Sequence, residues 1–222
     1  DEGAPHEHIA FMLHGTFASP NLLSRSPTEH GAFWRSANGE LQVRRTSDVP
    51  FTLWVPVGAG VGAQLPLVIA QHGLRGERSD ALPLAEALAA VGTAVIAFDA
   101  PFHGLRGDTG DRFSRFTGKS EPDGFGDAPG DFAGASDVNG QLTALHPFYY
   151  RDAMRQGAVD LMALVYLLQE GDLSGLADVD SSLAGTTFDT THLGFVGTDL
   201  GGEIGVAAAS AESGLATLVL AF

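Results

Sequence analysis

The chain has 222 residues, 44% of them hydrophobic, which is enough for one domain with a substantial core but too short for two comfortable ones. Its formal net charge of −15 argues against nucleic acid or an anionic membrane surface as a partner. The absence of cysteine from the sequence excludes disulfides, thiolate metal sites and a cysteine nucleophile. No apolar run approaches the roughly 20 residues that span a bilayer.

Residues 1–40 contain scattered proline and glycine breakers and are predicted to form an irregular N-terminal segment. The first five residues lack the basic and apolar regions of a signal peptide. They are compatible with the start of a processed, exported bacterial chain, so the localisation stays open. Residues 41–222 are predicted to form one α/β core. It is expected to begin with an antiparallel hairpin, because residues 41–45 and 51–55 both alternate apolar and polar side chains and a turn-like Ser47-Asp48-Val49-Pro50 lies between them.

Two short continuous apolar runs, 67–70 and 94–98, predict strands buried on both faces of a parallel sheet. Residues 80–91 between them predict a helix, which Gly92 ends. This strand–helix–strand order is a βαβ unit. Residues 104–146 carry Gly, Asp, Ser and Phe without a clear period. They predict a long loop or lid-like excursion over the C-terminal edge of the sheet.

A helix is predicted over 151–170, because its apolar residues fall on one face. A strand ending at Val196, a short helix from Gly201 and a last strand over 216–222 follow it. Strands and helices that alternate in this way predict a doubly wound, mostly parallel α/β sheet.

Three short motifs each follow a predicted strand, at the end where parallel strands place their functional loops. They are Gln71-His72-Gly73-Leu74, Asp99-Ala100-Pro101-Phe102-His103-Gly104 and Gly197-Thr198-Asp199-Leu200-Gly201-Gly202. The third lies between a β-rich run and a helix-like stretch, which is the context of the G-x-S-x-G nucleophile turn. Asp199 stands at the position where a serine is usual.

Together with residues 139–156, these motifs resemble bacterial α/β-hydrolases of the extracellular lipase/esterase type, over about residues 40–222. The resemblance implies the α/β-hydrolase fold, an esterase-like ancestry, a serine nucleophile and a site without a metal or another cofactor. It also implies that the backbone N–H groups of Leu74 and Leu200 form the oxyanion hole. The turn and supporting residues of the site would be His72, Gly73, Gly197, Gly201, Asp99 and His103.

An aspartate at the nucleophile position changes the possible chemistry. Attack by Asp199 on an ester would form an anhydride, which is less stable than the ester it came from. An aspartate is a good nucleophile for an sp³ carbon that bears a halide or an epoxide oxygen, and water activated by a histidine then hydrolyses the alkyl ester. Haloalkane dehalogenases and epoxide hydrolases use this same turn with aspartate in place of serine.

Three hypotheses stay open on this basis. The first is an esterase- or lipase-like hydrolase of an uncharged, fairly apolar small substrate, with Asp199 at the nucleophile position. The second is haloalkane dehalogenase or epoxide hydrolase chemistry with Asp199 as the native nucleophile. The third is a non-catalytic or inactivated hydrolase scaffold.

In this fold the catalytic acid and base usually follow the nucleophile, but the only acids after Asp199 are Glu203 and Glu212, both in or beside the predicted helix that follows it. All eight histidines precede it, and the chain ends at Phe222 inside a predicted strand. We therefore expect the sheet to lack its C-terminal strands, and a second polypeptide to carry them with the catalytic histidine and acid. A strand that ends unpaired at a sheet edge tends to pair with another chain, which favours the presence of a second polypeptide.

The remaining candidates have simpler interpretations. His72 and His103 are expected to be structural, His192 should lie far from Asp199, and His146 is the one stand-in for the base. Four acidic residues of the excursion could offer oxygen ligands to Ca²⁺, but their spacing does not fit an EF-hand loop, so a solvated acidic loop is expected. These four residues are Asp123, Asp127, Asp131 and Asp137. Five phenylalanines could line an apolar pocket or anchor the excursion: Phe102, Phe113, Phe116, Phe125 and Phe132.

Overall fold

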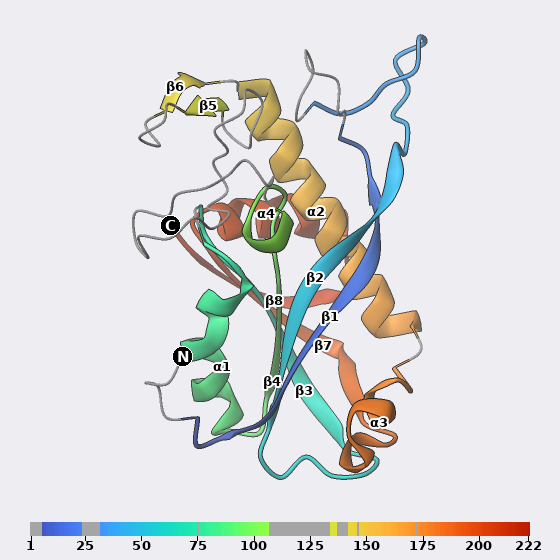
Figure 1. Ribbon diagram of the computed structural model, residues 1–222, viewed down its shortest axis with the longest axis vertical. Coiled ribbons are helices and arrows are strands. Elements are labelled where there is room, and N and C mark those ends of the chain that lie inside the picture. The colour runs from blue at the N-terminus through green and yellow to red at the C-terminus, as the bar shows by residue number, and fades with distance from the viewer. Residues whose placement is uncertain are drawn as a thin grey trace.

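A six-stranded mixed sheet forms the centre of the protein in the computed structural model (Figure 1). The structure describes residues 6–23, 32–74, 76–106, 134–136, 142–145, 147–171 and 173–222. The strands of this sheet are β1 (Ile9–Asn21), β2 (Arg45–Pro56), β3 (Gln64–Gln71), β4 (Ala94–Phe98), β7 (Thr187–Thr198) and β8 (Leu215–Ala221). Their spatial order is β1-β2-β4-β3-β7-β8.

Strands β4, β3, β7 and β8 run parallel, whereas β2 is antiparallel to both of its neighbours, β1 and β4. The prediction of a doubly wound, mostly parallel sheet is therefore confirmed. The two apolar runs predicted as strands are indeed the neighbouring strands β3 and β4.

Helices cover both faces of the sheet. Helix α1 packs against β4 and β2 on one face, while α2 and α4 pack together on the other (Figure 1). Within the described parts of the chain, no helix is both long and apolar enough to cross a membrane. The helical elements are η1 (Arg78–Ala81), α1 (Leu82–Ala89), η2 (Gly104–Arg106), α2 (Pro147–Glu170), α3 (Leu176–Val179), η3 (Ser181–Leu183) and α4 (Leu200–Ala209).

The predicted excursion over 104–146 begins with the turn η2 and includes a small antiparallel pair, β5 (Gly134–Ser136) and β6 (Leu142–Leu145). The rest of it lies outside the described residues. The candidate calcium ligands, the stand-in base His146 and every phenylalanine of the set except Phe102 also lie outside them.

The prediction of an irregular segment over 1–40 is wrong for Ile9–Asn21, which forms the long edge strand β1. Its side chains alternate between inward and outward positions, as in a strand with one buried face. The prediction treated Pro20 as the end of regular structure, but an edge strand tolerates proline. Pro20 lies near the end of β1, opposite Thr46. The N-terminal residues thus belong to the same domain as the rest of the sheet.

The predicted hairpin between 41–45 and 51–55 is also wrong. The supposed turn lies inside β2, whose partners are β1 on one side and, over Phe51–Trp54, β4 on the other. Pro50 fits there because its carbonyl accepts a hydrogen bond from Asp99 N–H just beyond the β4 ladder. A residue's N–H and C=O leave a strand on the same side, so an N–H at position 50 would face β4 just beyond the end of the β2–β4 ladder. The proline therefore removes no hydrogen bond between β1 and β2.

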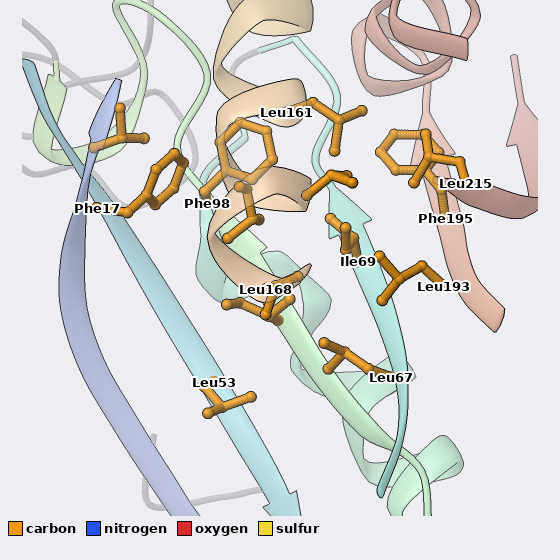
Figure 2. Packing of buried hydrophobic residues seen from close by; sticks show 14 of the residues in the cluster. Phe17, Leu53, Leu67, Ile69, Phe98, Leu161, Leu168, Leu193, Phe195 and Leu215 are labelled. Carbon is orange, nitrogen blue, oxygen red and sulfur yellow. The ribbon is translucent and has the colours of Figure 1, made fainter. Parts of the chain in front are cut away.

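The main core fills the space between the sheet and helices α2 and α4 (Figure 2). Leu67 and Ile69 of β3 point into it, while Ala70 faces the smaller cluster under α1. This alternation explains the continuous apolar run: both faces of β3 are covered. The face of α2 that was predicted to be apolar supplies Leu161, Val165 and Leu168. Each fully buried leucine contributes about 1.5–3 kcal/mol.

A chain of buried charges joins the sheet to α2 beneath the ends of the parallel strands. Asp160 of α2 accepts hydrogen bonds from Arg106 Nη1 at 2.7 Å, Ser19 Oγ at 2.6 Å and Gln156 Nε2 at 2.8 Å. The same Arg106 nitrogen donates to the carbonyl of Asp99 at 2.9 Å. A buried carboxylate is tolerated only when it is paired and hydrogen-bonded, and Asp160 meets both conditions.

Replacing Arg106 with methionine should lower the free energy of unfolding by about 3–5 kcal/mol, because it leaves the Asp160 carboxylate buried without a cation. Arg155→Met is the matched control, since the Arg155 side chain is 49% exposed and lies 3.5 Å from Asp152. The control should change stability by less than about 1 kcal/mol. Urea unfolding followed by tryptophan fluorescence measures both, and equal losses would contradict the structural role of the buried pair.

Candidate functional site

The three motifs singled out in the sequence meet at one edge of the sheet. Strand β3 lies between β4 and β7, and all three strands point the same way. The segments that follow them therefore leave the sheet side by side, which is where open α/β sheets bind their ligands. Hydrogen bonds between these segments fix their relative positions, as the following residues show.

His72 links the segment after β3 to the segment after β4. Its Nδ1 donates to the carbonyl of Gly73 at 2.8 Å, and its Nε2 accepts from Ala100 N–H at 3.0 Å. These two bonds require the neutral ring with the proton on Nδ1. Burial lowers the pKa of His72 to about 4. His72 therefore serves as a neutral crosslink and has no lone pair left for a proton from substrate.

Asp99 anchors the two turns that follow β3 and β4. Its Oδ1 accepts from Arg78 N–H at 2.9 Å, and its Oδ2 accepts from Arg78 Nη1 at 2.5 Å and from Leu105 N–H at 2.9 Å. Gly104 has a φ of +52°, and a Cβ there would lie 2.4 Å from the Asp99 carboxylate. Only glycine lets the chain wrap this closely around the buried charge.

His103 is fully buried beside His72, and the two ring centroids lie 5.0 Å apart. Its Nδ1 donates to the carbonyl of Pro101 at 2.8 Å. Burial, and to a lesser extent the neighbouring His72, lower the pKa of His103 to about 3. Both histidines of the motifs are thus held neutral below the site, and neither is exposed at its surface.

Asp199 occupies the sharp turn between β7 and α4 with φ = 50° and ψ = −116°. Phe102 is the one other non-glycine residue in the described chain with a positive φ. The Asp199 N–H donates to the carbonyl of Ala221 at 2.6 Å, and its carbonyl accepts from Gly202 N–H at 2.8 Å. These two hydrogen bonds hold the strained turn in place. The Asp199 side chain is exposed.

The turn is possible because glycines surround it. A Cβ at Gly201 would lie 2.3 Å from the carbonyl oxygen of Gln71, and one at Gly197 would lie 2.4 Å from the carbonyl oxygen of Gly201. A Cβ at Gly73 would approach the Asp199 Cβ to 3.1 Å. The start of α4 therefore lies directly against the end of β3, which brings the first and third motifs into contact.

A hydrogen bond across this junction joins Asp199 to the segment that follows β3. Leu74 N–H donates to Asp199 Oδ2 at 2.9 Å. Leu200, the other predicted contributor to an oxyanion hole, is the first residue of α4, and its side chain is buried. The N–H expected to bind the negative charge of a substrate is thus bound to the carboxylate of Asp199 itself.

The structure pairs Glu203, one of the two acids that follow Asp199 in the sequence, with Tyr150, which the sequence did not single out. Tyr150, in the first turn of α2, donates its hydroxyl to Glu203 Oε2 at 2.7 Å. Burial, this hydrogen bond and the charges of Glu203 and Asp199 raise the pKa of Tyr150 above its usual value. No local pattern could have found this pair, because its members are 53 residues apart on helices that meet only in the folded chain.

His192 lies away from the site. It is 78% exposed, and its Nδ1 forms a hydrogen bond with Asp189 Oδ2 at 2.9 Å near the start of β7. Among the described residues, no histidine forms a hydrogen bond with Asp199, and no three side chains of the metal-binding types gather as a metal site.

No protein-family model matches the chain, and no curated protein matches it. Among solved structures it is similar to a cold-adapted esterase from an Arctic intertidal metagenomic library, with 19% identity, a TM-score of 0.45 and coverage of 79% of this chain and 55% of that one. It is also similar to an ester-hydrolase from the metagenome of Lake Arreo, with 17% identity, a TM-score of 0.45 and coverage of 96% of this chain and 44% of that one. An α/β hydrolase from a Penicillium species has 13% identity, a TM-score of 0.46 and coverage of 95% of this chain and 45% of that one.

The chain thus spans about half the length of the solved structures that it matches. At these identities and TM-scores the likeness carries no argument about function. A function for this chain therefore has to follow from the chemistry of its own site.

Gly201→Ala should destabilise the protein by about 1–3 kcal/mol, because the new methyl group collides with the Gln71 carbonyl and forces β3 and α4 apart. Gly60→Ala is the matched control, since no atom lies within 4 Å of its added Cβ. The control should stay within about 0.5 kcal/mol of the parent. Thermal unfolding measures both changes, and an unaffected Gly201→Ala protein would contradict the close contact.

Acid should weaken the fold through His72 between about pH 6.5 and pH 4. Its folded pKa of about 4 lies below the unfolded value, so the unfolded chain binds more protons in this window and stability falls as the pH falls. The loss is on the order of 3 kcal/mol. His72→Asn should flatten this slope in urea titrations at stepped pH. His6→Asn, a change on the exposed N-terminal segment, should leave the slope unchanged.

Proposed function

We propose that the chain is a hydrolase of the α/β-hydrolase superfamily in which Asp199 is the nucleophile, acting at an sp³ carbon of an uncharged, fairly apolar substrate. The observation that carries the proposal is the 2.9 Å hydrogen bond from Leu74 N–H to Asp199 Oδ2. That bond orients the carboxylate and leaves Oδ1 as the oxygen that attacks. The strained turn at the end of β7 supports the same assignment, because it presents Asp199 at the exposed edge of the sheet.

The two steps of this chemistry both use that hydrogen bond. In the first, Oδ1 attacks the carbon, the carbon–halogen bond or the epoxide C–O bond breaks, and an alkyl ester of Asp199 forms. In the second, water adds to Cγ of that ester, and the negative charge develops on Oδ2. Leu74 N–H already lies against Oδ2, so it stabilises the charge where it forms.

Direct ester hydrolysis fits the present side chain less well. A serine-type mechanism needs the N–H groups of the oxyanion hole free for the substrate oxygen, but Leu74 N–H is bound to Asp199. The acyl product on an aspartate would also be an anhydride. An esterase-like ancestry is compatible with the glycine-framed turn, but the chemistry would then have changed with the side chain. Two carboxyl groups, those of Asp199 and Glu203, belong to this end of α4, which disfavours an anionic substrate.

A second candidate is an inactivated or purely binding scaffold. It is favoured by one observation: among the described residues, no histidine reaches Asp199 to act as the usual base. A second polypeptide that supplies the catalytic histidine and acid remains a prediction, and it would reconcile this observation with an active hydrolase.

Covalent labelling separates these candidates. The protein should gain the mass of one alkyl group on incubation with a 1-bromoalkane, with release of one bromide, and peptide mapping should place the group on Asp199. Asp199→Asn should gain no mass, because a neutral amide is a far weaker nucleophile. Glu170→Asn, a change at an exposed residue at the end of α2, is the matched surface control and should label normally.

Failure of both haloalkane and epoxide to label the protein or to be turned over would contradict the proposed function. Asp199→Ser then identifies the alternative. Hydrolysis of a short p-nitrophenyl ester by this variant indicates an inactivated esterase, and the absence of such activity indicates a scaffold.

A further inference from the structure

A second carboxylate shares the turn of Asp199. Glu203 lies one helical turn further along α4, and its N–H donates to the carbonyl of Asp199 at 3.3 Å. Asp199 is the N-cap of α4 and Glu203 lies in its first turn, so both carboxylates belong to the same end of this helix. The Tyr150 hydroxyl donates to Glu203 Oε2 at 2.7 Å, so the first turn of α2 lies against this end of α4.

We propose that Glu203, held in place by Tyr150, is the base that activates water for hydrolysis of the ester formed on Asp199. This inference rests on the proposed function, since it assigns the second of its two steps. The proposal gives a chemical role to two residues that the sequence motifs did not include.

The hydrogen bonds around Glu203 leave it suited to this task. Tyr150 donates to Oε2 at 2.7 Å, and the described part of the chain offers no hydrogen bond or ion pair to Oε1. Glu203 is half-buried as a residue, so it lies neither in the core nor fully in solvent. One oxygen is thus fixed by the phenol, and the other is placed to accept a proton from water.

The histidines of the two motifs and of β7 are less suited to this role. The Nε2 lone pair of His72 accepts from Ala100 N–H, and His103 is fully buried beside it. His192 is paired with Asp189 near the start of β7. A carboxylate can replace a histidine as base: retaining glycosidases hydrolyse an ester on one carboxylate with water that a second carboxyl group deprotonates.

The step balances as follows. Glu203 Oε1 takes a proton from water while the water oxygen bonds to Cγ of the Asp199 ester. The tetrahedral species collapses, the bond between Cγ and Oδ1 breaks, and the alcohol leaves with Oδ1 and the proton from Glu203. Asp199 keeps the oxygen that came from water and loses its remaining proton to solvent. Tyr150 keeps its proton throughout and acts as a positioning residue through Glu203.

Single-turnover labelling with a 1-bromoalkane tests the assignment, because it measures formation and loss of the ester separately by intact mass. Glu203→Gln should form the ester within about threefold of the parent rate but lose it at least 100-fold more slowly, as expected for removal of a general base. Tyr150→Phe should slow the loss by a smaller factor and leave formation unchanged. Glu170→Gln at the end of α2 is the matched control and should change neither rate.

A different set of results would overturn the proposal. Loss of the ester at the parent rate in Glu203→Gln would place the base elsewhere and leave the function of Asp199 standing. The absence of any ester in the parent protein would overturn both. If Glu203→Gln does not fold, Glu203→Ala with added formate replaces it: restored ester hydrolysis supports the role of the carboxylate, and hydrolysis that formate leaves unchanged contradicts it.

Discussion

The site depends on one buried carboxylate, that of Asp99. It receives hydrogen bonds from the main chain and the guanidinium of Arg78, which follows β3, and from Leu105, which follows β4. Its own carbonyl holds Arg106, and Arg106 in turn binds Asp160 of α2. Removing a charge from water is expensive, so such a group can exist only where every neighbour is in position. The buried Asp99 carboxylate therefore fixes the positions of the loops that surround Asp199.

The parallel half of the fold could be predicted from sequence because its signals are local. Continuous apolar runs identified β3 and β4, and the helical period identified α2. The antiparallel half could not, because its signals conflict. Pro20 looked like a breaker although an edge strand accepts it, and residues 47–50, which look like a turn, lie inside β2, while 41–44 lie before it. In both cases the pairing partner, which no local pattern specifies, decided the structure.

The candidate site shows the same division. Three glycine motifs placed Asp199, His72 and Asp99 at one edge of the sheet, because parallel strands bring their carboxyl ends together. The motifs could not reveal that Leu74 N–H binds Asp199 instead of standing ready for a substrate, since this contact depends on the length of the side chain. Nor could they reveal Tyr150, whose partner Glu203 comes from a different helix. Contacts of this kind are made by tertiary packing alone.

The backbone at position 199 carries a consequence for the history of the chain. A non-glycine residue in so sparsely populated a conformation costs about 1–3 kcal/mol, and glycine adopts the same turn without that penalty. Selection for folding alone therefore favours loss of the aspartate. A screen for heat resistance that ignored chemistry would find one of its easiest gains at the residue on which the proposed reaction depends. At position 199, a substitution that relieves the backbone strain would raise stability but remove the proposed nucleophile.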